Sequence, residues 1–78
     1  MERGGEERLI QNKYTLEERI ERARNFIRKN GYMRNYEYAQ LNGLANSTAS
    51  RELIRIINDP RSGIRSEGSK SSKIYLLT

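Results

Sequence analysis

A run of small and cationic hydrogen-bonding side chains stands out within residues 46–58, in the stretch NSTASRELIRIIN. At about 100° per residue, its polar members share one side of a helix, and that side contains no acid. Small side chains in a first turn let a helix end enter a groove about 12 Å wide, where arginine can bind guanine through two hydrogen bonds. The spacing therefore favours contact with a nucleic acid, although a solvated helix face capped by Asn46 or Ser47 would show the same pattern. The side comprises Ser47, Ser50, Arg51, Ile54 and Asn58, with Arg55 beside them.

Three side chains of the predicted helix suit particular contacts. Arg51 suits a guanine edge, Asn46 suits adenine or a phosphate, and Ile54 suits the methyl group of thymine. For Ile54 we rank two other interpretations higher, namely packing under a neighbouring hairpin or contact with the first helix of a second copy. The opposite side of the predicted helix is its core face, formed by Ala49, Leu53 and Ile56 with Ile57 at the flank.

A second cationic group follows in residues 61–73, a segment rich in serine. It comprises Arg61, Arg65, Lys70 and Lys73, with Glu67 as the opposing acid. Cations on a loop can contact phosphates and position a domain without reading sequence. Because the segment directly follows residues 46–58, we expect phosphate contact. A plain hairpin tip whose charges maintain solubility is the alternative.

The composition leaves little for catalysis. The 78 residues include no His, no Cys and a single Asp, Asp59, so the usual general base and the commonest zinc ligands are missing. We expect no enzyme activity in this chain, no metal and no cofactor. The net charge is +5, and residues 22–78 carry eleven bases and four acids, which favours a polyanionic partner.

No apolar run approaches the roughly 20 residues that cross a bilayer. We therefore expect no membrane partner, and the lack of Cys fits a cytoplasmic location.

The first helix is predicted over residues 16–29. Thr15 and Glu18 match a capping box, and Asn30–Gly31 is typical of a helix end. Its predicted core face consists of Leu16, Ile20, Ala23 and Ile27, spaced by three and four. Its arginines are predicted to lie on a solvated surface: Arg19, Arg22, Arg24 and Arg28.

Two shorter helices are predicted next. One spans residues 36–42, with Asn35 as its cap, Tyr38 and Leu41 facing inward, and Gly43 as its end. The other runs from residue 45 or 46 to 58 and stops at Asp59–Pro60. A very short extended segment precedes the pair. Residues 73–77 are predicted to form a strand, and residues 65–73 a polar loop that closes a β-hairpin.

Two short helices around a tight glycine-containing turn form a helix-turn-helix unit, and a basic hairpin directly after it makes the winged variant. The stretches NYEYAQLNGLANSTASREL and GIRSEGSKSSKIYLL resemble the winged helix-turn-helix domain at the C-terminal end of ATP-dependent DNA helicase RecG-related proteins. The matching positions are Asn35, Glu37-Tyr38, Leu41, Gly43, Thr48-Ala49, Arg51-Glu52-Leu53 and the terminal aromatic-aliphatic strand. Ala45 stands where that family usually has Ser or Thr, so Asn46 or Ser47 is expected to supply the cap.

We therefore predict an α+β, mainly helical fold, a winged helix-turn-helix of three helices and a small β-hairpin wing. Residues 1–14 are expected to be a flexible tail or linker, and residues 15–78 the domain. The expected partner is double-stranded DNA, with residues 46–58 in the major groove and residues 61–73 on the backbone. The domain is expected to belong to a larger helicase-related or transcription-regulating protein, whose other domains could also contact it. The alternative is a protein–protein interaction module of the same fold, whose interface would use Ile54, Phe26 and Leu77.

Overall fold

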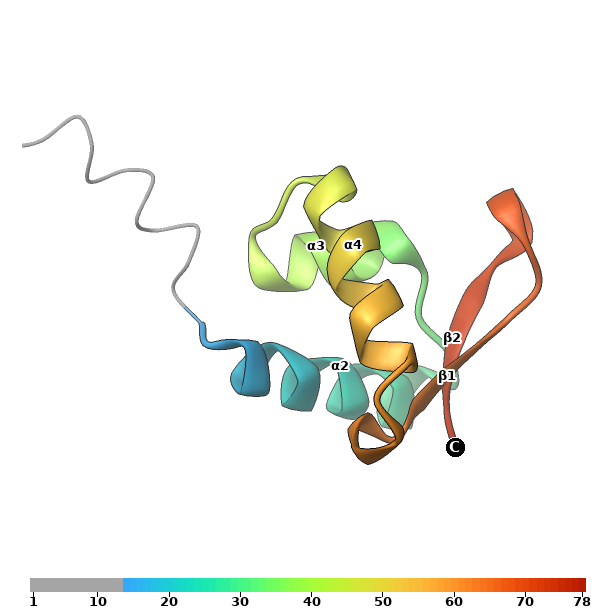
Figure 1. Ribbon diagram of the computed structural model, residues 1–78, viewed down its shortest axis with the longest axis horizontal. Coiled ribbons are helices and arrows are strands. Elements are labelled where there is room, and N and C mark those ends of the chain that lie inside the picture. Colours follow the sequence, from blue (N-terminus) through green and yellow to red (C-terminus); the bar gives the residue numbers. More distant parts are fainter. Residues whose placement is uncertain (1–13) are drawn as a thin grey trace, which may run out of the picture.

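The computed structural model describes residues 14–78, and Figure 1 shows their arrangement. The predicted tail, residues 1–14, lies outside the described residues except for Tyr14. Three helices and a two-stranded antiparallel sheet make a mainly helical α+β domain, as predicted for a winged helix-turn-helix. Among residues 14–78, no helix has the length and apolar character to cross a bilayer. The elements are α2 (Leu16–Asn30), α3 (Asn35–Asn42), α4 (Asn46–Ile57), a 3₁₀ turn η1 (Pro60–Ser62), β1 (Ile64–Glu67), a 3₁₀ turn η2 (Lys70–Ser72) and β2 (Ile74–Leu77).

Helix α2 begins and ends as its sequence predicts, with one extra residue at its end. The Thr15 hydroxyl accepts a hydrogen bond from the Glu18 backbone N–H at 3.1 Å, and the Glu18 carboxylate accepts from the Thr15 N–H at 2.9 Å. This capping box satisfies two of the N–H groups that a helix start leaves open. Acids occupy the first turn and bases the last, which suits the helix dipole.

Helices α3 and α4 are joined by a tight turn at Gly43, whose φ of 68° lies in the left-handed region that glycine adopts at little cost. The prediction that Asn35 caps α3 is wrong. Arg34 is the capping position, and the Glu37 carboxylate accepts a hydrogen bond from the Arg34 backbone N–H at 2.7 Å. Asn35 is instead the first residue of the helix, and its amide is free to contact α4.

Helix α4 starts at Asn46 and ends at Ile57. Its capping position is Ala45, which makes no side-chain hydrogen bond to the N–H groups of the first turn. The expectation that Asn46 or Ser47 supplies the cap is therefore wrong. The helix starts where the sequence predicted, so both side chains belong to its first turn, where they are exposed.

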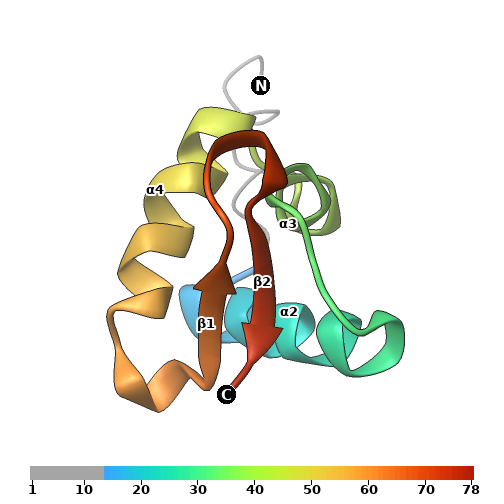
Figure 2. The same cartoon turned by 90° about the vertical axis from the view of Figure 1, so that its right-hand side faces the viewer.

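The hairpin pairs Ile64 with Leu77 and Ser66 with Tyr75. Residues 65–67, predicted as part of a loop, belong to strand β1, and the loop is residues 68–73. Met33 bonds to Tyr75 on the other side of β2, through N···O distances of 3.0 and 2.8 Å. Strand β2 therefore lies between β1 and the predicted extended segment. In Figure 2 the hairpin stands between α4 and the α2–α3 connection.

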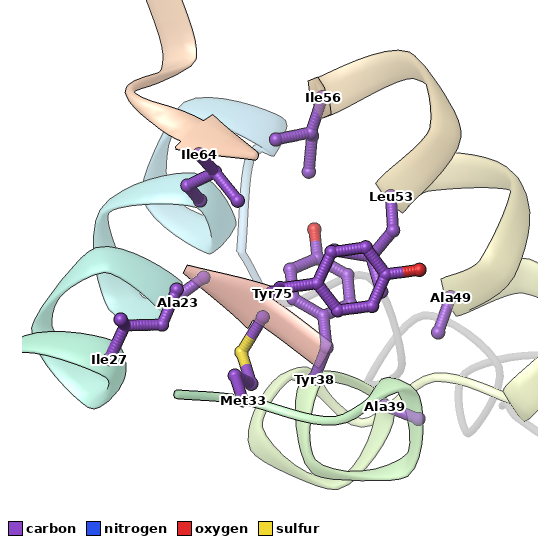
Figure 3. Close-up of a cluster of buried hydrophobic side chains, with 10 residues drawn as sticks. All are labelled: Ala23, Ile27, Met33, Tyr38, Ala39, Ala49, Leu53, Ile56, Ile64 and Tyr75. Carbon is purple, nitrogen blue, oxygen red and sulfur yellow. The ribbon is translucent and has the colours of Figure 1, made fainter. Parts of the chain in front are cut away.

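The core lies where α2, the helix-turn-helix unit and the hairpin meet. Figure 3 shows its side chains converging from all of these elements around Tyr38 and Tyr75. The predicted inward residues of α2 and α4 are confirmed, except that Leu16 and Ile20 are only partly buried. Leu41, predicted to face inward, is half-buried, and Ala39 is buried in its place. The fully assembled core comprises Ala23, Ile27, Met33, Tyr38, Ala39, Ala49, Leu53, Ile56, Ile64 and Tyr75.

Three arginines of α2 form hydrogen bonds to α3, α4 and the η1 turn. The prediction that they lie on a solvated surface is therefore wrong. Arg19 binds both carboxylate oxygens of Glu52 in α4, at 3.0 and 2.7 Å. Arg22 donates to the side chain of Asn42 and to the Leu41 carbonyl. Arg24 donates to the Ser62 carbonyl at 2.7 Å. Arg28, by contrast, is exposed and donates to the Asn25 side chain within α2.

Candidate nucleic-acid interface

A groove of about 510 Å³ runs between α4, the start of α3 and the wing. We call it the wing groove. The groove is mixed polar and apolar, with cations on two sides, and none of its lining residues is an acid. In Figure 1 the hairpin tip and the first turns of α4 stand apart at the same end of the domain, and residues of both line the groove. Its lining residues are Arg34, Asn35, Tyr36, Asn46, Ser50, Ile54, Lys70, Lys73 and Tyr75.

Helix α4 presents the predicted face to solvent. Asn46, Ser47, Arg51 and Arg55 are exposed, and Ser50 is half-buried at the groove floor. On the opposite side Ala49 and Leu53 are fully buried, which confirms the predicted register of the helix. Ile54 is 50% exposed and lines the groove, so it does not pack under the wing.

The one acid of α4 is kept off this face. Glu52 points toward α2, where Arg19 binds it through two hydrogen bonds and the Tyr38 hydroxyl donates to it at 2.8 Å. Burial, and next the hydrogen bond to the Glu52 carboxylate and its charge, raise the pKa of Tyr38 far above its usual value. Tyr38 therefore stays protonated and remains a donor. The outer face of α4 carries positive charge alone.

The start of α3 holds two groove residues in place. The Asn35 amide nitrogen donates to the Asn46 carbonyl at 3.3 Å, and the Ser50 hydroxyl donates to the Asn35 amide oxygen at 2.9 Å. This chain connects the first turn of α3 to the first two turns of α4. Asn35 was predicted to cap α3, and its position in the wing groove was not predicted.

The wing brings two of its four predicted cations to the groove. Lys70 and Lys73 line it, and Lys70 has a φ of 51° at the start of η2. Within residues 14–78, neither lysine forms an ion pair, nor do Arg51 and Arg55. Lys70 and Lys73 therefore offer their charge to the groove, whereas Arg51 and Arg55 are exposed on α4 but do not line it.

Arg61 and Arg65 lie elsewhere. Arg61 pairs with Asp59 at 3.2 Å, and its hydrogen bond lowers the pKa of that carboxyl group. Arg65 pairs with Glu67 on strand β1. Neither arginine lines the wing groove. Each arginine is partly neutralised by an acid two residues away along the chain. Neither arginine therefore adds positive charge to the wing groove.

Four further groove residues were not among the predicted site residues, namely Arg34, Asn35, Tyr36 and Tyr75. Arg34 directly precedes α3, Asn35 and Tyr36 are its first two residues, and Tyr75 belongs to β2. The bridge between Met33 and Tyr75 brings these segments together. No local pattern signals such a contact, because it depends on strand pairing between distant residues.

Other kinds of site find less support. In the described part of the chain, no group of three or more acidic side chains could hold a metal ion.

A comparison with known protein families, with curated proteins and with solved structures finds no match for this chain.

Proposed function

We propose that this domain binds double-stranded DNA, with α4 in the major groove and the wing against the backbone. The observation that carries the proposal is the acid-free wing groove, in which exposed hydrogen-bonding side chains of α4 lie beside Lys70 and Lys73. A recognition helix of this fold contacts base edges through its N-terminal residues, and those residues here are Asn46, Ser47 and Ser50.

The start of α4 supports the same proposal. Its first turn has no side-chain cap, so backbone N–H groups and the positive end of the helix dipole remain available for a phosphate. Arg51 extends from the second turn for a guanine edge, and Arg55 lies one turn further for the backbone. Lys70 and Lys73 would hold phosphates on the other side of the groove and set the register of α4.

The rival proposal, a protein-docking module, has weaker support. Phe26 and Leu77, two of the three apolar residues expected to form its interface, pack against the core and are only partly exposed. Ile54 is left as the one exposed aliphatic side chain of the three, and it lies among cations. The groove is mixed polar and apolar, and DNA is favoured over an apolar partner because cations line the groove and no acid does.

The resemblance to the terminal module of DNA helicase RecG-related proteins is consistent with DNA binding. We propose that the domain positions a larger helicase-related or regulatory protein on DNA. A single module of this size has a footprint of about 600–1,000 Å², so we expect weak binding with limited specificity.

An NMR titration with a short mixed-sequence duplex tests the proposal. Amide shifts should cluster in residues 46–55 and 68–73. The logarithm of the association constant should fall with the logarithm of salt concentration with a slope of about −3 to −4, as expected for four phosphate contacts. Shifts confined to the α2–α3 surface, or binding that does not respond to salt, would contradict it.

A further inference from the structure

The backbone carbonyl of Asn46 fixes the orientation of a nearby side-chain amide. A carbonyl oxygen can only accept hydrogen bonds, so the Asn35 atom facing it at 3.3 Å must be the amide nitrogen. The opposite orientation would place two oxygens against each other. The Asn35 amide oxygen must therefore be the atom that faces Ser50, at 2.9 Å from its hydroxyl oxygen.

This orientation fixes the hydroxyl proton of Ser50 in turn. An amide oxygen has no proton to give, so the Ser50 hydroxyl must donate to it. A serine hydroxyl has one proton, and here that proton points at α3. Toward a ligand in the wing groove, the Ser50 oxygen therefore offers only its lone pairs, which accept hydrogen bonds. Ser50, usually able to donate or accept, becomes an acceptor at this site.

We infer that Ser50 recognises the exocyclic amino group of a base, and that Asn35 is the positioning residue that makes it do so. The inference rests on the proposed binding of DNA in the wing groove. In the major groove only adenine N6 and cytosine N4 carry such donors, whereas guanine O6 and thymine O4 are acceptors. An acceptor-only Ser50 therefore rejects guanine and thymine at its position.

Ile54 distinguishes adenine from cytosine. It lies one turn beyond Ser50 on the same side of α4 and lines the same groove. The two residues are separated by about 6 Å along the helix axis, close to two base steps of about 3.4 Å each. An apolar side chain gains by contact with the thymine methyl group, which a G·C pair lacks. The second and third turns of α4 together select A·T pairs.

Binding to two duplexes of equal length tests the inference, one of alternating dA and dT and one of alternating dG and dC. The A·T duplex should bind about fourfold more tightly, the value of the methyl contact, because cytosine N4 in the G·C duplex can donate to Ser50 as adenine N6 does. Replacing adenine by 2-aminopurine moves the amino group out of the major groove, and should weaken binding by the wild type about fivefold, the value of one net hydrogen bond. Replacing thymine by uracil removes the methyl group and should weaken binding by the wild type but not by Ile54→Ala.

Two variants separate the roles of Ser50 and Asn35. Ser50→Ala should bind the adenine and 2-aminopurine duplexes equally. Asn35→Ala frees the hydroxyl proton, which can then be donated to thymine O4 in the 2-aminopurine duplex, so the loss of binding on 2-aminopurine substitution should be smaller than in the wild type. A purely structural role for Asn35 would weaken both duplexes by the same factor.

The failures are distinguishable. Equal binding of the A·T and G·C duplexes by the wild type, or a loss on 2-aminopurine substitution that persists undiminished in Ser50→Ala and Asn35→Ala, would overturn this inference and leave DNA binding in place. Failure of both duplexes to bind would overturn the proposed function itself, and the inference with it. Urea unfolding of each variant establishes that it is folded under the binding conditions.

Discussion

At the scale of single residues, Glu52 decides the electrostatic character of α4. It lies directly beside Arg51 in sequence, yet its carboxylate turns to the other side and is bound by Arg19 and Tyr38. Its side chain is 15% exposed, and that of Arg19 is 13% exposed. Because breaking such a pair leaves a poorly solvated charge behind, the three residues act as one unit that joins α2, α3 and α4.

Tyr38 gives this unit a pH dependence. Burial and the Glu52 carboxylate raise the pKa of Tyr38, while an unfolded tyrosine titrates near pH 10. The unfolded chain therefore loses this proton first, and the free energy of unfolding should fall as the pH rises above about 10. Tyr38→Phe should lower stability by about 1 kcal/mol at neutral pH and flatten that alkaline decline, as measured by urea unfolding between neutral and alkaline pH.

The exposed Tyr36 provides the matched control. Its side chain is 51% exposed, so Tyr36→Phe should leave the unfolding free energy within about 0.5 kcal/mol of the wild type. Equal alkaline slopes for the wild type and Tyr38→Phe would show that Tyr38 does not titrate differently in the folded and unfolded states.

Substitution of Arg51 tests whether the outer face of α4 contacts DNA. Arg51→Ala should weaken binding of a preferred duplex by about 1–3 kcal/mol and relax preference at one base pair. Arg28→Ala removes the same charge from an exposed site on α2 and should change binding much less. Fluorescence anisotropy with a set of duplexes measures both. Equal losses for the two variants would mean that net charge, and not the face of α4, determines binding.

At the scale of elements, α4 must anchor the fold on one side and meet its partner on the other. Leu53 and Ile54 are adjacent and demonstrate this division. Leu53 is fully buried, and Leu53→Ala should lower the free energy of unfolding by about 2–5 kcal/mol. Ile54→Ala should lower it by less than about 1 kcal/mol, because Ile54 is half exposed. Urea or thermal unfolding compares the two, and similar losses would contradict the register of the helix.

The wing divides its cations in the same way. Lys70→Gln with Lys73→Gln should weaken binding to all duplexes alike and make the salt slope shallower by about 1.8, since each phosphate contact contributes about 0.9. Arg61→Gln with Arg65→Gln removes the same formal charge from residues that pair with Asp59 and Glu67. This control should leave most of the slope unchanged. A larger effect from the arginine pair would move the phosphate contacts to the base of the wing.

The wing loop is also shaped by a close backbone approach. Gly68 has a φ of 81°, and a Cβ atom there would lie 2.6 Å from the Ser72 carbonyl oxygen. Only glycine fits between the two sides of the loop, which holds residues 68–73 in a compact form. This compact loop keeps Lys70 and Lys73 on the same side of the hairpin, facing α4.

At the scale of the whole molecule, local rules predicted most of the fold. The capping box at Thr15, the glycine at residue 43 and Asp59–Pro60 each act within a few residues of chain, and the helices follow them closely. The hairpin was also predictable from its apolar strand. The failures occurred where a distant partner competes for a side chain. Asn35 bonds to α4 rather than capping its own helix, and Arg19 crosses to Glu52.

The same distinction applies to the candidate site. The outward face of α4 follows from helical periodicity, so Asn46, Ser50 and Arg51 could be named in advance. Charge alone, however, did not separate Lys70 and Lys73 from Arg61 and Arg65, although the acids that pair with these arginines, Asp59 and Glu67, lie only two residues away along the chain. The groove itself exists only once β2 pairs with Met33.

The alanine at residue 45 has a consequence for how such a domain can change over time. A serine or aspartate there would complete the start of α4 and stabilise the protein by about 0.5–2 kcal/mol. In the proposed complex, however, it would occupy the N–H groups that a phosphate needs, and an aspartate would also repel that phosphate. Selection for stability would therefore favour a capping side chain at residue 45, whereas selection for phosphate binding would favour the alanine.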